Sequence, residues 1–290
     1  MPDFVYHRPE SLTEALDLLG RHAGEAKVLA GGQSLLPVMA LRLSQPGHVV
    51  DLDRVTELAE LAPGPSGGVT VGAMVRHADV ERSELVARSA PLLARTVNLI
   101  GHPAIRNRGT PCGSLAHADP AAELPALALA TGAEIVVRSA TRERVLTARD
   151  FFVSFLTTAL EPDEMVVEVR FPAPGPRTGG SVREVSRRHG DFALVGVCCS
   201  VTLAEDGTVS GAALAYFGVD STPVRAEGAE RRLVGSVLDA AAAAAAAREA
   251  AQELEPGDDL HATATYRRHV AEQLTRRALV EAADRAGGAA

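Results

Sequence analysis

The chain has 290 residues, which is long enough for about two domains and a substantial core. Hydrophobic residues make up 46% of it and aromatic residues only 3%, so the core must consist mainly of Ala, Val and Leu, as in tightly packed α/β or α+β proteins. A net charge of −8, with Lys27 as the single lysine, argues against a nucleic-acid-binding surface, which needs clustered basic residues.

The N-terminal residues lack the basic and apolar regions of a signal peptide, and no apolar stretch is long enough to span a membrane. We therefore expect a cytoplasmic protein without a membrane span. The three cysteines, Cys112, Cys198 and Cys199, form no CxxC motif and cannot supply the four ligands of an iron–sulfur cluster. No His, Cys or carboxylate pair has metal-ligand spacing, so we expect no metal in this chain.

The first part of the chain predicts a strand–loop–helix unit. Ser11 and Glu14 form a capping box at the start of a helix whose apolar residues follow at helical spacing up to Leu19. A buried strand at 27–30 runs into Gly31 and Gly32, a helix begins at 35, and a second strand covers 48–52. The loop 30–34 thus lies between a strand and a helix N-terminus.

The middle of the chain begins after a turn-rich stretch at 62–68. We predict a strand at 69–73, then helices at 77–87 and 91–99. Gly101 and Pro103 end the second helix and lead to the loop 110–114. Asp119 is a candidate N-cap, with Pro120 at N1, for a helix that continues through Ala130, and a strand follows at 134–137.

The composition changes to Pro and Gly at 171–176, which marks the best domain boundary. Beyond it we predict strands at 192–203 and 209–219, joined by a turn, and place Cys198 and Cys199 in a core. Two helices follow, one containing the alanine run 240–247 and the other covering about 262–285.

The two small-residue loops, 30–34 and 110–114, are the most informative feature of the sequence. Small side chains let the oxygens of a diphosphate approach several main-chain N–H groups. Neither loop fits GxGxxG or GxxxxGK[ST], which weakens the Rossmann and P-loop interpretations. We therefore expect a large dinucleotide held at two places.

Four motifs together resemble a known family. They are AGGQSLLP at 30–37, IGH with IRNRGT at 100–110, SLAHADPAAELP at 114–125 and RHGDFA at 188–193. In this order they are similar to the FAD-binding medium subunits of molybdenum hydroxylases of the carbon monoxide dehydrogenase and xanthine dehydrogenase type. The resemblance covers nearly the whole chain.

The resemblance implies an α+β fold with a PCMH-type (vanillyl-alcohol-oxidase-like) FAD-binding domain at 1–175, made of subdomains at about 1–60 and 61–175. A C-terminal domain of carbon monoxide dehydrogenase flavoprotein type would occupy 176–290, with a small antiparallel sheet and helices.

The same resemblance implies a set of cofactor contacts. The first loop would wrap the FAD diphosphate through main-chain N–H groups, and the second loop would form the opposite wall. Ile100 would pack on the cofactor, Glu123 would bind its polar middle, and Leu160 and Arg183 would approach the flavin ring. The predicted FAD-binding residues are Val28, Leu29, Ala30, Gly31, Gly32, Gln33, Ser34, Leu35, Ile100, Thr110, Cys112, Gly113, Ser114, His117, Asp119, Glu123, Leu160 and Arg183.

Some of these residues keep a second interpretation. His117 could touch the flavin or its phosphates, or make a structural hydrogen bond. Asp119 could contact the cofactor but is mainly a helix cap, and Cys112 is by default a small buried residue.

The second loop departs from the family pattern, Thr-Ile/Val-Gly-Gly-Ser/Asn. Cys112 replaces the first glycine, where a positive φ would be costly, and Pro111 removes an N–H donor. Either the special backbone angle lies only at Gly113, or FAD binding is altered.

The resemblance also implies a function without any catalytic acid, base or nucleophile in this chain. FAD here would pass electrons from [2Fe-2S] clusters of a small subunit to an external acceptor, while a large molybdopterin subunit oxidises the substrate. The assembly would be a dimer of heterotrimers. Two alternatives are a free-standing FAD-dependent oxidoreductase of the same fold and a nucleotide-binding scaffold without redox activity.

Overall fold

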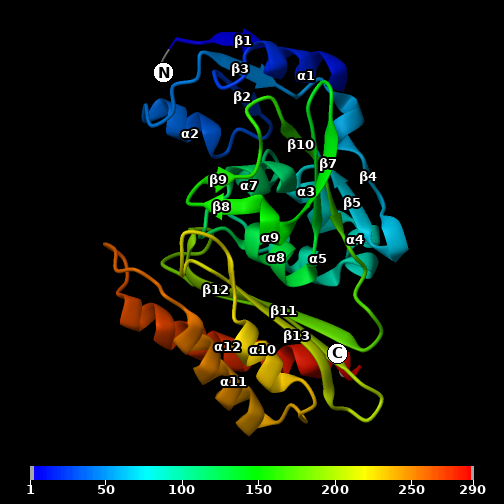
Figure 1. Ribbon diagram of the computed structural model, residues 1–290, viewed down its shortest axis with the longest axis vertical. Helices are drawn as coiled ribbons and strands as arrows, with labels where there is room; N and C mark the ends of the chain where they lie inside the picture. Colours follow the sequence, from blue (N-terminus) through cyan, green and yellow to red (C-terminus); the bar gives the residue numbers. More distant parts are fainter. Residues whose placement is uncertain (1–2, 289–290) are drawn as a thin grey trace.

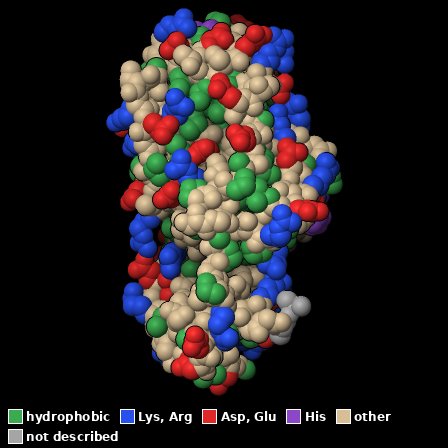
Figure 2. All heavy atoms as spheres, turned by 90° about the vertical axis from the view of Figure 1, so that its right-hand side faces the viewer, with side chains coloured by type: hydrophobic (Ala, Val, Ile, Leu, Met, Phe, Trp, Pro, Cys, Tyr) green, Lys and Arg blue, Asp and Glu red, His purple; other side chains and the backbone are tan. Residues whose placement is uncertain are grey.

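The computed structural model describes residues 3–288, and its three main sheets follow one another along the long axis (Figure 1). Strands and helices of both short and medium length alternate through the chain, which confirms the α+β class. On the face shown in Figure 2, arginines and acidic side chains are interspersed from one end to the other.

The first sheet contains three parallel strands in the order β1 (Val5–His7), β3 (His48–Asp51), β2 (Ala26–Leu29). Helix α1 (Leu12–Arg21) and helix α2 (Leu35–Ala40) connect them. The predicted cap of α1 is confirmed, since the Ser11 hydroxyl accepts a hydrogen bond from the Glu14 N–H at 3.2 Å. The loop 30–34 therefore joins β2 to α2, as the sequence indicates.

The central sheet has five antiparallel strands in the order β4 (Leu61–Pro63), β5 (Val69–Gly72), β10 (Met165–Phe171), β6 (Glu134–Arg138), β7 (Glu143–Thr147). Short 3-10 turns at Thr56–Ala59 and Pro65–Gly67 flank β4. The helices of this part are α3 (His77–Arg82), α4 (Glu84–Ser89), α5 (Pro91–Val97), α6 (Pro103–Arg106), α7 (Pro111–His117), α8 (Glu123–Thr131) and α9 (Ala148–Phe151). A small hairpin, β8 (Phe152–Ser154) and β9 (Thr157–Thr158), completes it.

The third sheet is antiparallel and follows the chain: β11 (Thr178–Ser186), β12 (Ala193–Leu203), β13 (Val209–Phe217), β14 (Val224–Arg225). Helices α10 (Glu227–Leu233), α11 (Ala240–Glu253) and α12 (Ala264–Ala286) cover its outer face, and the central part of the molecule covers the other (Figure 1). Successive side chains of a strand alternate between faces. Cys198 accordingly belongs to the core shared with the central part, and Cys199 to the core beneath the helices.

Some predicted elements differ from the structure. The helix expected at 77–87 is two helices, because Ser83 has an extended backbone and its side chain caps α4. Helix α8 begins at Glu123, not after Asp119, whose carboxylate accepts a hydrogen bond from the Ala121 N–H at 2.9 Å. The prediction of an N-cap at Asp119 is therefore wrong: it stabilises a turn that precedes the helix. The Pro/Gly-rich segment separates β10 from β11, two strands that the sequence reasoning missed.

Candidate functional site

The first loop presents a row of unused main-chain donors. Within residues 3–288, the N–H groups of Gly31, Gly32, Gln33 and Ser34 donate no hydrogen bond. Gly32 has a φ of +72°, which favours glycine, and the Gln33 side chain donates to the Gly31 carbonyl at 3.1 Å. Consecutive free N–H groups in such a turn form a concave site for an anion.

The second loop lies directly against the first. A Cβ added at Gly31 would come within 2.3 Å of the Arg108 carbonyl oxygen and 2.6 Å of the Gly109 Cα. A Cβ added at Gly113 would lie 3.7 Å from the Cβ of Ala30. The structure thus places 30–34 and 108–113 side by side, the arrangement that a shared diphosphate site requires, and glycine at 31 is what permits it.

The second loop is the first turn of α7. The Thr110 hydroxyl accepts a hydrogen bond from the Gly113 N–H at 3.0 Å, and Pro111 occupies the first helical position. Proline is well tolerated there because the first N–H groups of a helix have no partner within the helix. Neither Cys112 nor Gly113 has a positive φ. Of the two alternatives, a special backbone angle at Gly113 is therefore wrong, altered FAD binding stays a prediction, and Cys112 is accommodated without backbone strain.

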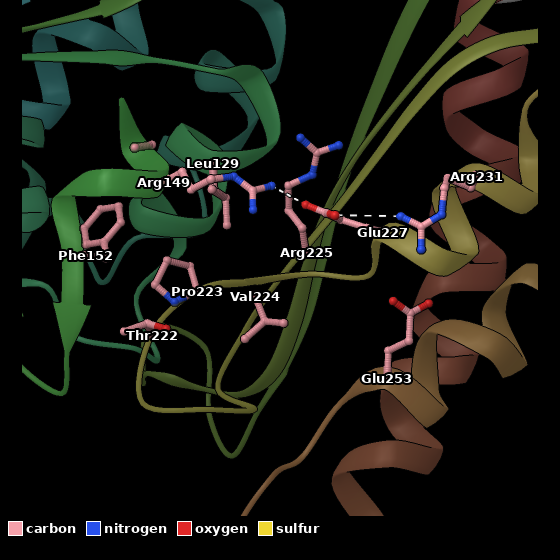
Figure 3. Close-up of a pocket in the computed structure, with 11 residues that line it drawn as sticks. Leu129, Arg149, Phe152, Thr222, Pro223, Val224, Arg225, Glu227, Arg231 and Glu253 are labelled. Carbon is pink, nitrogen blue, oxygen red and sulfur yellow. Dashed lines mark hydrogen bonds and ion pairs between the residues drawn. The ribbon is translucent and has the colours of Figure 1, made fainter. Parts of the chain in front are cut away.

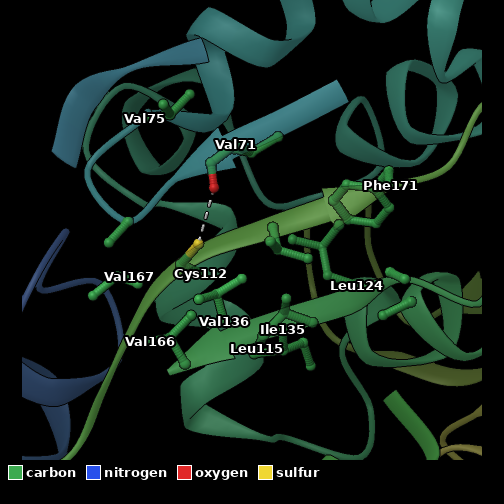
Figure 4. Close-up of a cluster of buried hydrophobic side chains, with 14 of the residues drawn as sticks. Val71, Val75, Cys112, Leu115, Leu124, Ile135, Val136, Val166, Val167 and Phe171 are labelled. Carbon is green, nitrogen blue, oxygen red and sulfur yellow. Dashed lines mark hydrogen bonds between the residues drawn. The ribbon is translucent and has the colours of Figure 1, made fainter. Parts of the chain in front are cut away.

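The Cys112 side chain points into the central core (Figure 4). Its Sγ lies 3.4 Å from the Val71 carbonyl oxygen among buried aliphatic side chains, and the residue is 2% exposed. Burial raises the pKa of this thiol well above its ordinary value. Cys112 is therefore a small buried core residue, and only its main chain is available to a bound cofactor.

A segment of the C-terminal part reaches the same region. A Cβ added at Gly190 would lie 2.6 Å from the His102 ring, and the ring centroids of His102 and His189 are 5.9 Å apart. The loop between β11 and β12 therefore packs on the segment that leads to the second loop. The Gly218 N–H also donates to the Pro120 carbonyl at 2.8 Å, which holds the two parts of the chain together nearby.

Two carboxyl groups influence one another where the two parts meet, those of buried Glu123 and half-buried Glu184. Burial raises the pKa of Glu123 to about 7. Burial, and secondarily the charge of Glu123, raises the pKa of Glu184 to about 8. The Glu184 Oε2 atom is buried and has no hydrogen-bond partner within the described residues. An unpaired buried oxygen of this kind fits a polar group of a bound ligand.

Arg183 lies on the face of the third sheet that the C-terminal helices cover. Its guanidinium pairs with the Glu281 carboxylate of α12 at 2.9 Å, on the helix side of the sheet. Because neighbouring residues of a strand face opposite sides, Glu184 is the residue that faces Glu123 and the central part. The structure therefore places Arg183 on the face turned away from Glu123, and its approach to the flavin ring stays a prediction. Glu184, on the facing side, carried no signal in the sequence beyond its charge.

The remaining predicted contacts are half-buried. Ile100 and Leu160 pack at the edge of the central core. His117 Nε2 lies 4.0 Å from the Asp119 carboxylate, and this neighbour favours a structural role for the histidine. The exposure of 28–30 and 32–35, apart from the more exposed Gln33, is intermediate, so part of each of these residues is accessible at the surface.

A cavity of about 490 Å³ lies elsewhere, between α9 and α10 (Figure 3). Arg149 and Arg231 both pair with Glu227, and the Glu253 carboxylate accepts from the N–H groups of Gly228 and Ala229. Its charges are therefore already compensated, and none of the predicted site residues lines it.

Comparison with protein families identifies the family to which this chain belongs. Residues 2–174 match the family described as FAD binding domain in molybdopterin dehydrogenase, and residues 180–282 match the CO dehydrogenase flavoprotein C-terminal domain. The chain belongs to this flavoprotein family. It is the FAD-binding medium subunit of a molybdenum hydroxylase and thus part of an oxidoreductase.

Similar proteins agree over their full length. The chain is 40% identical to the carbon monoxide dehydrogenase medium chain of Hydrogenophaga pseudoflava, covering 96% of each, and 40% identical to the 6-hydroxypseudooxynicotine dehydrogenase complex subunit alpha of Paenarthrobacter nicotinovorans, covering 98% of this chain and 96% of that one. A solved structure of the Hydrogenophaga enzyme matches with a TM-score of 0.93 over 97% of both chains. Quinoline 2-oxidoreductase from Pseudomonas putida 86 matches with a TM-score of 0.93, 38% identity and 98% coverage of both.

These relatives are named as chains or subunits of larger enzymes, so the medium subunit works with partner chains. No helix within residues 3–288 combines the length and the apolar character needed to cross a bilayer. The site itself fits FAD: it offers free N–H donors at 31–34, a close backbone contact at Gly31 and an unpaired carboxyl oxygen at Glu184.

Proposed function

We propose that this chain relays electrons inside a molybdenum hydroxylase complex, from [2Fe-2S] clusters of a small subunit to an external acceptor. FAD, when bound, supplies the chemistry, since it takes up electrons singly and delivers them in pairs. All three cysteines are buried and unpaired, two of them on opposite faces of one sheet, so this chain cannot ligate a cluster of its own. The observation that supports the proposal most directly is the row of free N–H groups at 31–34 against the second loop.

In this proposal the chain binds and orients the cofactor. The N–H groups of 31–34 donate to the diphosphate, and Thr110, Gly113 and Ser114 form the facing wall. Glu123 and Glu184 offer oxygens to the hydroxyl groups of the cofactor, and Ile100 and Leu160 give it apolar contacts. The loop 187–192 covers the site from the C-terminal part.

The proposed assembly contains a small [2Fe-2S] subunit and a large molybdopterin subunit that oxidises the substrate, arranged as a dimer of heterotrimers. Within this chain we propose a division into 1–175, with subdomains at about 1–60 and 61–175, and 176–290. Three unpaired thiols support a reducing, cytoplasmic location.

The test compares two glycine substitutions. Gly31→Ala introduces a Cβ that would overlap the Arg108 carbonyl, so the two loops must separate. Gly20→Ala places the same methyl group in open space within α1. We expect purified Gly31→Ala to lose at least about 90% of its FAD, which corresponds to a tenfold or greater weakening of binding, about 1.4 kcal/mol. Gly20→Ala should keep the wild-type FAD-to-protein ratio, measured by visible absorbance.

Two outcomes would contradict the proposal. The first is a Gly31→Ala chain that retains full FAD. The second is a wild-type chain that binds FAD but, with the small subunit present, does not accept electrons from its reduced clusters in a stopped-flow experiment.

A further inference from the structure

Three histidines meet at the end of the molecule that the FAD site does not use. His7 ends β1, His48 begins β3, and His22 follows the last residue of α1. One ring nitrogen from each lies within 4.8 Å of the other two, and all three residues are half-buried. His22 is 15 positions after His7 and 26 before His48, so no local spacing in the sequence indicates the cluster.

The cluster is built by the first sheet (Figure 1). β1 and β2 both pair with β3 in parallel, with Ala26 opposite His48, and the His22 carbonyl accepts from the Ala26 N–H at 2.9 Å. The loop 30–34 follows the other end of β2, about 10 Å further along the strand at 3.3 Å per residue. The cluster is therefore separate from the proposed diphosphate site.

The rings stack on one another. Ring centroids are 3.6 Å apart for His22 and His48, 5.2 Å for His7 and His48, and 5.4 Å for His7 and His22. His7 Nε2 and His48 Nδ1 share a hydrogen bond at 2.9 Å. Burial, followed by the two other imidazoles and Arg21, lowers the pKa of His7.

We propose that His7, His22 and His48 bind one divalent transition metal ion of the Zn²⁺ class. Imidazole is a preferred ligand of zinc, nickel and copper, and three histidines with water in the fourth position make a recurrent zinc site. The half-exposed cluster leaves room for that water. The ion would tie β1, α1 and β3 together at a sheet of only three short strands.

The rearrangement that binding needs is small. With zinc–nitrogen distances of 2.0–2.1 Å and a tetrahedral angle, two ligand nitrogens lie about 3.3 Å apart. The His7–His48 pair must therefore open by about 0.4 Å. The stacked rings must also turn about their Cβ–Cγ bonds so that their nitrogen lone pairs converge, and half-exposed side chains have the space to do so.

The decisive variant is His22→Phe. Phenylalanine preserves an aromatic ring against His48 but has no nitrogen ligand, and the backbone hydrogen bond from residue 22 to Leu18 does not depend on the side chain. His269→Ala is the matched control, since it removes an exposed histidine of α12 far from the cluster in sequence. All chains are purified without a polyhistidine tag and stripped with a chelator.

The measurement is calorimetric titration with ZnCl₂, together with the change in Tm on zinc addition. We expect wild type and His269→Ala to bind one Zn²⁺ per chain and to gain several degrees in Tm. His22→Phe should bind at least about tenfold more weakly and gain nothing, with a zinc-free Tm close to wild type. Co²⁺ should give a tetrahedral absorption spectrum with wild type and not with His22→Phe.

A packing role alone predicts a different pattern. In that case wild type takes up no stoichiometric zinc, or His22→Phe and wild type respond to zinc equally, and either result overturns the proposal. Neither readout depends on flavin or on electron transfer, so the test stands apart from the proposed function.

Discussion

Glu123 and Glu184 show how strongly the pKa of a side chain depends on its surroundings. Glu123 comes from α8 and Glu184 from β11, 61 positions later in the chain, yet the charge of one raises the pKa of the other. Both carboxyl groups are withdrawn from water, so both favour the protonated form. A protonated carboxyl can donate as well as accept a hydrogen bond, which suits the hydroxyl-rich middle of a dinucleotide.

This pair predicts a pH dependence for the flavin-free chain. The pKa values rise from the ordinary 4.5 to about 7 and about 8 on folding, so the folded chain holds protons that the unfolded chain releases. The resulting stability is complete below about pH 4.5 and is lost as the pH rises to about 8. Between pH 5 and pH 8.5 we expect a loss on the order of 3 kcal/mol per group, measured by urea unfolding.

Glu184→Gln should reduce that loss by about half, because the amide does not titrate. Glu205→Gln, in the exposed turn between β12 and β13, is the control and should leave the pH profile unchanged. Equal profiles for wild type and Glu184→Gln would show that Glu184 carries no raised pKa.

Helix α7 accommodates the two residues of the second loop that depart from the family pattern. Its first turn contains Pro111 and Cys112, and Thr110 holds that turn by accepting from Gly113. The same helix sends Cys112 and Leu115 into the core. The cap and the core contacts together fix the helix beside Ala30.

Thr110→Ala should therefore affect both stability and cofactor binding. Loss of an N-cap costs about 1 kcal/mol, and loosening the first turn should weaken FAD binding at least threefold. Thr263 caps α12 in the same way, because its hydroxyl accepts a hydrogen bond from the Tyr266 N–H at 3.2 Å. Thr263→Ala should therefore lower Tm similarly but leave the FAD content unchanged. Thr110→Ser should restore both properties. Equal FAD content in the two alanine variants would contradict this role for α7.

At the scale of the whole molecule, the third sheet joins the two parts of the chain. One face of β12 and β13 completes the central core, and the other lies beneath α11 and α12. Buried Arg267 of α12 donates to the carbonyls of Leu194 and Gly218 and pairs with Asp259 at 2.6 Å. It thus ties the start of β12 to the residue after β13, at the sheet end where the Gly218 N–H donates to the Pro120 carbonyl.

Two arginines at this junction should differ strongly on replacement. Arg267→Ala removes the guanidinium that donates to two backbone carbonyls and to one oxygen of the Asp259 carboxylate, and it should lower the free energy of unfolding by roughly 2–4 kcal/mol. Arg149→Ala removes an exposed pair with Glu227 and should cost less than about 1 kcal/mol. Urea unfolding measures both, and comparable losses would show that the junction does not depend on Arg267. Arg267→Lys should recover only part of the lost free energy of unfolding, because one ammonium group cannot replace the forked guanidinium group.

Much of this protein could be predicted from local sequence. The cap at Ser11, the strand before Gly31, the helices at 240–253 and 264–286 and the interior position of both adjacent cysteines all follow from patterns within a few residues. The ordered set of motifs identified the family, and the family models confirm it. Short-range periodicity and capping are local properties, so the sequence alone determines them.

Only the tertiary structure decided which residues meet. Arg183 and Glu184 are equivalent in a strand pattern until the helices that cover one face are known, and the angle at Gly113 depended on whether α7 begins before it. The three histidines converge because parallel pairing places His7 of β1 opposite Val50, two residues beyond His48 of β3, and the end of α1 brings His22 to the same place. Long-range contacts of this kind arise from the packing of whole elements, and no pattern of neighbouring residues encodes them.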